Sequence, residues 1–313
     1  MTSTSGHRRR GLVLGCGGTL GAAWTVAALV ALRDALDWDP RDADLLMGTS
    51  GGAELATMLG SGVSLGDIVE MQLGTTTHPA LIDHLADAPG RYPPVPRLRP
   101  GSLNVFRKRL GVRSAAGLLP IGTGDPAWLD RLATQLNPGR DWVTHPATWL
   151  VAMDYDSGTR VAFGSPGAAT ATISQALRAS WAIPGWFPSV DVDGRRFVDG
   201  GVASTASVDL AATAALDEVI VLAPMASSTR IPGRGAAAAE RLLRNHMSAV
   251  LDDEIEMLAK SETRAIRIDA SAADLAVMGP NFMDGRRRLA TFEHALRSTR
   301  VAVESALTTG VFA

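Results

Sequence analysis

A sharp turn from strand to helix, centred on Ser50, is the sequence feature that most constrains the fold. The apolar run at residues 44–47 predicts a strand, and residues 53–59 predict a helix after it. Between them, glycines flank the serine on both sides in the sequence GTSGG. Residues without a Cβ permit such a turn, which lifts the serine hydroxyl clear of the backbone near the positive end of the helix. A serine presented in this way can act as a nucleophile if a base lies nearby.

Composition favours a globular protein with a large core. The chain has 313 residues, of which 46% are hydrophobic and 20% charged. We expect a single domain over residues 8–313, preceded by a disordered tail at residues 1–7. The net charge of −2 gives no bulk argument for nucleic acid as a partner. Cys16 is the only cysteine, which excludes an intrachain disulfide and a cysteine-based metal site.

Neither a signal peptide nor a transmembrane helix is expected near the N-terminus. The basic residues 8–10 precede an apolar stretch, but glycines at four positions between 15 and 21 interrupt it. No run reaches the roughly 18 uninterrupted apolar residues of a membrane span. The sequence therefore predicts a cytoplasmic protein.

Strand-like and helix-like segments alternate along most of the chain. Strand patterns occur at residues 11–14, 148–153, 160–163, 190–192, 196–198 and 218–222, and helical patterns at 22–36, 173–180, 207–215, 236–263 and 285–309. This alternation predicts an α/β fold, a three-layer α/β/α sandwich around a mostly parallel sheet. Residues 62–140 differ because they are rich in Pro and Arg with short helical pieces. We expect them to form an irregular insertion that serves as a cap.

Two further segments carry chemistry besides Ser50. A glycine-rich loop at residues 15–21 connects the first predicted strand to the first helix. Such a loop exposes backbone N–H groups that can bind the oxyanion of a tetrahedral intermediate, and one donor of this kind is worth about 3–4 kcal/mol of barrier. Asp199 ends a predicted hairpin and is followed by two glycines. A carboxylate there can take the serine proton directly if partial desolvation raises its pKa.

In combination, these segments resemble the patatin-like phospholipases, which are lipid acyl hydrolases with a Ser–Asp dyad. The resemblance covers most of residues 11–224. The family's oxyanion loop aligns with residues 16–21, its Gly-x-Ser-x-Gly motif with residues 48–52, and its Asp-Gly-(Gly/Ala) motif with residues 199–201. Residues 179–188 resemble the segment that precedes the catalytic aspartate. Each motif is weak by itself, whereas all of them in the family's order form a specific pattern.

The resemblance implies that the chain cleaves carboxylic esters of lipids, with Ser50 as nucleophile and Asp199 as base. It assigns the oxyanion hole to the backbone N–H groups of Gly17 and Gly18, with that of Cys16 as a third candidate donor. Glycines support the two turns: Gly48, Gly51 and Gly52 at the turn of Ser50, and Gly200 at the turn of Asp199. No metal or organic cofactor is implied. The expected partners are a lipid or acyl-ester substrate and, transiently, a membrane surface.

Three positions depart from the family pattern. Cys16 replaces the first loop glycine, Leu20 replaces the usual basic residue, and Thr205 stands near where an asparagine often follows the aspartate. These changes affect expected rate and substrate choice more than fold. They leave open a catalytically weak, lipid-binding or regulatory protein with the same fold.

Other interpretations remain open. A Ser–His–Asp α/β-hydrolase would use Ser50 and Asp199 with His246 or His294, although both histidines lie in polar helical stretches and only one strand–helix unit precedes the elbow. A dinucleotide-binding turn at residues 15–20 lacks its third glycine, since Leu20 stands there. Aromatic residues just before Asp199 could line an acyl pocket or pack in the core: Trp181, Trp186 and Phe187.

Overall fold

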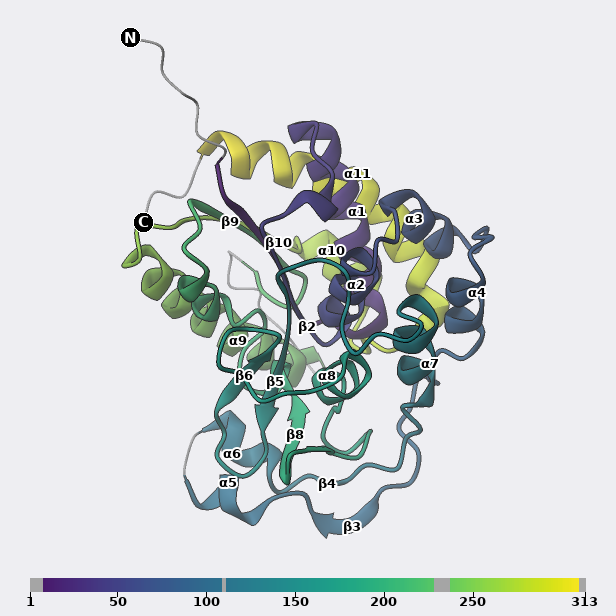
Figure 1. Cartoon of the computed structure of the whole chain (residues 1–313), viewed down its shortest axis with the longest axis vertical. Helices are drawn as coiled ribbons and strands as arrows, with labels where there is room; N and C mark the ends of the chain where they lie inside the picture. The colour runs from purple at the N-terminus through teal and green to yellow at the C-terminus, as the bar shows by residue number, and fades with distance from the viewer. Residues whose placement is uncertain (1–7, 109–110, 228–236, 310–313) are drawn as a thin grey trace.

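The computed structural model describes residues 8–108, 111–227 and 237–309 (Figure 1). The tail predicted at residues 1–7 lies outside these residues. An eight-stranded sheet runs through the molecule in the order β10-β9-β1-β2-β5-β8-β7, and β6 pairs with β5. The strands are β1 (Arg10–Leu14), β2 (Leu45–Thr49), β5 (Thr148–Asp154), β6 (Arg160–Phe163), β7 (Val190–Val192), β8 (Arg195–Asp199), β9 (Glu218–Ala223) and β10 (Arg264–Asp269).

Parallel pairing joins the five strands from β10 to β5, whereas β6, β7 and β8 pair antiparallel. Strands β2, β5 and β9 are buried along their whole length, which explains their near-continuous apolar sequences. The predicted mostly parallel sheet is therefore confirmed.

Helices cover both faces of the sheet and make the predicted three layers. Alternate residues of β1 enter two separate cores, because successive side chains of a strand point to opposite faces. Leu12 and Leu14 pack in one core with α1, α2 and α11, and Val13 packs in the other with α9 and η3. These elements are α1 (Gly18–Leu36), α2 (Gly51–Gly60), α9 (Ala237–Ala259), α11 (Arg288–Thr309) and the 3-10 helix η3 (Val208–Ala214).

The insertion at residues 62–140 divides into two parts. The outer part consists of the helices α3 (Leu65–Leu73), α4 (Pro79–Ala86) and α7 (Ala127–Leu136). These helices bury Ile68, Leu81 and Leu129 in the main core. Between them lie α5 (Leu103–Arg107), α6 (Val112–Ala116) and a separate two-stranded sheet of β3 (Arg97–Pro100) and β4 (Pro120–Ile121). Figure 1 shows this middle part at the lower end of the molecule. The insertion is thus more regular than its Pro-rich sequence suggests.

Sequence patterns did not predict the strand β10. The remaining elements are short. They are α8 (Ile173–Ser180), α10 (Ala272–Met278) and the 3-10 helices η1 (Pro40–Asp42), η2 (Gly200–Val202) and η4 (Gly285–Arg287). The predicted helix at 207–215 is the 3-10 helix η3. By length and composition α1 is the one described helix that could cross a membrane, but 67% of its most apolar window is buried inside the fold.

Candidate active site

The ends of β2 and β8 meet head-on along one edge of β5. Thr49 at the end of β2 pairs with Val151, and Asp199 at the end of β8 pairs with Ala152, the next residue of β5. Strand β6 occupies the opposite edge of β5. Since β2 and β8 run toward each other, Ser50 and Asp199 are brought together although 149 positions separate them. Both side chains line the same cavity, and the Ser50 hydroxyl lies near enough to the Asp199 carboxylate to favour its charged form.

Ser50 occupies a strained turn of the kind that the sequence predicts. Its φ of 56° and ψ of −121° lie where a residue with a side chain is rarely found, and it directly precedes α2. The turn is too tight for side chains at its flanks. A Cβ on Gly48 would lie 2.3 Å from the Gly52 carbonyl oxygen, and one on Gly52 would lie 2.1 Å from that of Leu14. The flanking glycines are therefore required for space, and the positive φ falls on the serine.

Ser180 holds the elbow in place, a role that the sequence did not reveal. Its hydroxyl accepts a hydrogen bond from the Ser50 backbone N–H at 2.9 Å and donates one to the Val151 carbonyl at 2.6 Å. Ser180 is fully buried at the end of α8. In the sequence, Ser180 is marked only by its place in the segment before Asp199. Its contact with Ser50 depends on how α8 packs on β5, which no local pattern reveals.

The environment of Asp199 suits a carboxylate that accepts and releases a proton near neutrality. Burial raises the pKa of Asp199 to about 7, against hydrogen bonds from the Ser50 side chain and the Gly201 N–H that favour the charged form. The Gly201 N–H donates to Asp199 Oδ1 at 2.7 Å. Gly200 has no room for a side chain, since a Cβ there would lie 2.7 Å from the Val151 carbonyl oxygen. The carboxylate is thus fixed on a turn that only small residues allow.

The glycine-rich loop lies beside the elbow. A Cβ on Gly51 would come within 2.7 Å of the Gly18 carbonyl oxygen, so the loop and the elbow are in close backbone contact. Gly18 has a φ of +55° and begins α1. Within the described residues, the N–H groups of Gly17 and Gly18 have no hydrogen-bond acceptor. They are therefore available to an oxyanion.

Cys16 differs from these two glycines. Its backbone N–H already donates to the Thr205 carbonyl at 2.7 Å, and its thiol contacts the Thr205 hydroxyl at 3.6 Å. Cys16 therefore anchors the loop, and we correct the expectation that its amide serves the oxyanion hole. Burial raises the pKa of its thiol to about 12, which keeps it protonated. Leu20 is fully buried in the core, so a basic side chain at that position would be desolvated here.

An apolar cavity of about 310 Å³ opens over Ser50 and Asp199. The insertion contributes Ala115, Ala116 and Leu119 to its wall. The remaining wall residues are mostly apolar: Ile183, Pro184, Val202, Met225, Leu243, Met247 and Phe282. Trp181, Trp186 and Phe187 are not among the lining residues. Trp181 packs edge-on against Trp128 in the core, and Trp186 and Phe187 line a separate hollow beside Asp125.

Neither candidate histidine reaches the cavity. His246 is exposed on α9, although its neighbours Leu243 and Met247 line the wall. His294 lies on α11 with Nε2 3.3 Å from Asp274 Oδ1. Over residues 8–108, 111–227 and 237–309, no group of three His, Cys, Asp or Glu side chains is placed to hold a metal ion.

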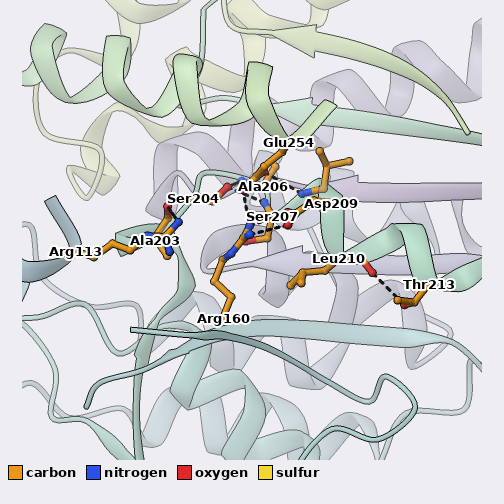
Figure 2. A network of polar contacts seen from close by, with 11 residues as sticks. Arg113, Arg160, Ala203, Ser204, Ala206, Ser207, Asp209, Leu210, Thr213 and Glu254 are labelled. Carbon is orange, nitrogen blue, oxygen red and sulfur yellow. Dashed lines mark hydrogen bonds and ion pairs between the residues drawn. The ribbon is translucent and has the colours of Figure 1, made fainter. Parts of the chain in front are cut away.

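A buried ionic cluster supports the loop that follows Asp199 (Figure 2). Arg160 on β6 bonds to both oxygens of Asp209 and contacts Glu254 on α9. The Glu254 carboxylate also accepts a hydrogen bond from the Val208 N–H at 3.1 Å. From the insertion, Arg113 donates to the Ala203 carbonyl at 3.3 Å. The cluster therefore joins β6, α9 and the loop, while Arg113 joins the same loop to α6.

Comparison with known proteins gives one family match. The family model of the patatin-like phospholipases matches residues 12–212, a range that includes Ser50 and Asp199. No curated protein matches the chain. Among solved structures, the chain is similar to the crystal structure of VipD from Legionella pneumophila at 14% sequence identity and a TM-score of 0.39, with 93% of this chain and 67% of that chain covered.

Proposed function

Because the chain belongs to the patatin-like phospholipase family, we propose that it is a serine acyl hydrolase that cleaves carboxylic esters of lipids. One observation carries this proposal: the Ser50 hydroxyl and the buried Asp199 carboxylate lie beside each other in the wall of one apolar cavity. The chemistry then needs only a dyad, since the carboxylate contacts the nucleophile without an imidazole between them. A cytoplasmic location is proposed from the sequence.

In the acylation step, Ser50 Oγ attacks the ester carbonyl carbon while Asp199 accepts the hydroxyl proton. The carbonyl oxygen becomes an oxyanion, which the N–H groups of Gly17 and Gly18 bind. When the tetrahedral intermediate collapses, the bond to the alcohol breaks and Asp199 returns the proton to the departing oxygen. A pKa of about 7 lets the carboxylate serve in both directions near neutral pH.

In the deacylation step, water takes the place of the alcohol. Asp199 accepts a proton from the water as it attacks the acyl-serine, and the same two N–H groups bind the second oxyanion. Collapse releases the fatty acid and returns the proton to Ser50. The apolar wall of the cavity favours an acyl chain there, because it offers few polar groups to a head group.

The proposal is tested with a chromogenic acyl ester. Ser50→Ala and Asp199→Ala should each abolish turnover while circular dichroism and the unfolding midpoint stay close to wild type. An organophosphonate probe should label the wild-type protein and fail to label Ser50→Ala. Turnover at the wild-type rate in either variant would refute the dyad, and an unlabelled, inactive wild type would favour a lipid-binding protein without catalysis.

A further inference from the structure

Charge is distributed very unevenly along this chain. Between Asp87 and Asp125 there is no acidic residue, yet seven arginines and lysines occur. The other 23 basic residues share the rest of the chain with all 32 acidic ones. A near-neutral protein therefore contains one strongly basic segment, which falls within the insertion.

The basic segment folds into a compact unit, which we call the cap unit and define as residues 97–108 and 111–121. Strands β3 and β4 pair antiparallel, with Arg97 opposite Ile121 and Pro100 opposite Pro120. The pairing continues where the Gly101 N–H donates to the Leu119 carbonyl at 2.9 Å. Figure 1 shows β3, β4, α5 and α6 together at the lower end of the molecule.

Three arginines of the cap unit carry no partner among the described residues, whereas Arg113 bonds to the Ala203 carbonyl and Lys108 to that of Ser157. Arg97, Arg99 and Arg107 are exposed, and within the part of the chain that the structure describes they have no ion pair. Arginines elsewhere commonly pair with a carboxylate, as Arg41 does with Asp39 and Arg195 with Asp154. The cap unit therefore presents three arginines without an ion pair within a short stretch of chain.

Large apolar side chains are exposed between these cations. Leu98, which stands between Arg97 and Arg99 on β3, is 93% exposed. Further exposed apolar residues of the same unit are Leu103, Phe106, Leu118 and Leu119. The cap unit contains no acidic residue of its own, and the Asp156 carboxylate that contacts Ser102 and Asn104 is already paired with Arg196. Apolar side chains interleaved with cations match a surface that is anionic outside and apolar beneath, as the head groups and acyl chains of a bilayer are.

The cap unit is continuous with the cavity above Ser50. Leu119 is 44% exposed to solvent and also lines that cavity, together with Ala115 and Ala116. A bilayer in contact with the cap unit would therefore lie beside the cavity that receives the acyl chain.

We propose that the cap unit docks onto anionic lipid bilayers, with Leu98 and Phe106 directed to the acyl region. Arg97 and Arg99 leave β3 on the face opposite Leu98, and their long side chains, with that of Arg107, reach back to the head groups. Docking then delivers lipid to the cavity of the proposed hydrolase, so the role of docking rests on the proposed function. Docking itself needs no catalysis, because it depends on residues outside the dyad.

Vesicle binding by the Ser50→Ala protein tests the proposal without turnover. It should sediment with phosphatidylcholine vesicles that contain one-third phosphatidylglycerol, bind pure phosphatidylcholine at least about tenfold more weakly, and be released by salt. Adding Arg97→Glu and Arg99→Glu should weaken binding at least about tenfold, since each basic residue near such a surface contributes about 1 kcal/mol. Adding Leu98→Ser and Phe106→Ser instead should also weaken it severalfold.

A matched control uses exposed positions on α11, far from the cap unit in Figure 1. Val301→Ser with Arg297→Glu makes one apolar and one charge change and should leave vesicle binding unchanged. In the presence of Ser50, all the variants should hydrolyse a soluble acyl ester at the wild-type rate. Equal affinity for neutral and anionic vesicles, full binding by the Leu98→Ser/Phe106→Ser protein, or an equal loss in the control would each overturn docking.

The two proposals fail in different ways. A wild-type protein that binds anionic vesicles but never hydrolyses a soluble ester would refute the proposed hydrolase and leave docking intact. A protein that hydrolyses the soluble ester while binding no anionic vesicle would refute docking and leave the hydrolase intact.

Discussion

Two buried carboxyl groups mark the ends of the loop that follows β8, Asp199 at its start and Glu254 bonded to the Val208 N–H at its end, and they have opposite surroundings. Burial raises the pKa of both Asp199 and Glu254 to about 7. Around Asp199 the donors are neutral, namely the Ser50 hydroxyl and the Gly201 N–H. Around Glu254 the principal donor is the Arg160 guanidinium, which also binds Asp209 (Figure 2).

The difference teaches that a raised pKa does not by itself identify a catalytic group. Structural ion-pair networks perturb carboxyl groups as strongly as active sites do. A carboxylate beside a neutral hydroxyl and a cavity can exchange protons with a substrate. A carboxylate in contact with an arginine is held in place instead. We therefore assign chemistry to Asp199 and support of the loop to Glu254.

The largest expected effect separates the two carboxyl groups by turnover. Asp199→Asn keeps the size of the side chain but removes the proton acceptor, so kcat should fall by about 10²–10⁴-fold. Glu254→Gln should lower kcat by less than about tenfold, because Glu254 does not line the cavity. Initial rates with a chromogenic acyl ester measure both. A loss in Glu254→Gln as large as that in Asp199→Asn would reverse the assignment.

The second prediction concerns stability, for which the cluster around Glu254 should matter more than an exposed ion pair. Arg160→Met leaves the Glu254 and Asp209 carboxyl groups without their cation, which should cost about 3–5 kcal/mol of unfolding free energy. Arg195→Met is the matched control. Its guanidinium is 45% exposed and pairs with Asp154, so the loss should stay below about 1 kcal/mol. Urea denaturation followed by fluorescence measures the difference, and equal losses would show that the Arg160 cluster gives no special support.

The sequence predicts those features of the fold and the site that a short stretch of neighbouring residues encodes. The strained turn at Ser50, the loop at Gly17 and Gly18 and the turn at Asp199 are encoded by short patterns, and all three were predicted correctly as neighbours of strands. The fold class followed from the alternation of strands and helices.

Features that depend on distant contacts were not predicted. Ser180 and Arg160 act through the register of β5 with its neighbours, which no local pattern reveals. The aromatic residues before Asp199 illustrate the same limit, because Trp181 faces the core while Ile183 and Pro184 face the cavity. The insertion was predicted as irregular because Pro-rich sequence conceals the pairing of β3 with β4.

The third prediction uses pH to sharpen the comparison. Asp199 must be ionised to accept the serine proton, so kcat/KM should rise as pH passes through about 7 and then level off. Glu254→Gln should leave the midpoint of this profile unchanged. A profile that is flat from pH 5 to 9, or a midpoint that moves with Glu254, would contradict the role of Asp199 as base.

Stability should change with pH in the opposite direction. The pKa of Asp199 in the fold exceeds its ordinary value of 3.8, so the folded chain binds the proton more tightly than the unfolded chain. The stability that this carboxyl contributes is therefore complete below about pH 4 and is lost as pH rises to about 7. Asp199→Asn should reduce the slope of the unfolding free energy across this window and leave the part that Glu254 contributes, and a slope equal to the wild type's would contradict the shift.

The smallest expected effect concerns the two histidines that a Ser–His–Asp triad would need. His246→Ala and His294→Ala should each leave kcat/KM within about twofold of wild type, because neither side chain lines the cavity. His294→Ala also removes a partly exposed contact with Asp274, which should cost no more than about 1 kcal/mol of stability. Steady-state rates and urea denaturation of the two variants measure these effects. A hundredfold loss of kcat/KM in either one, with the fold intact, would mean that an imidazole relays the proton and that Asp199 is not the direct base.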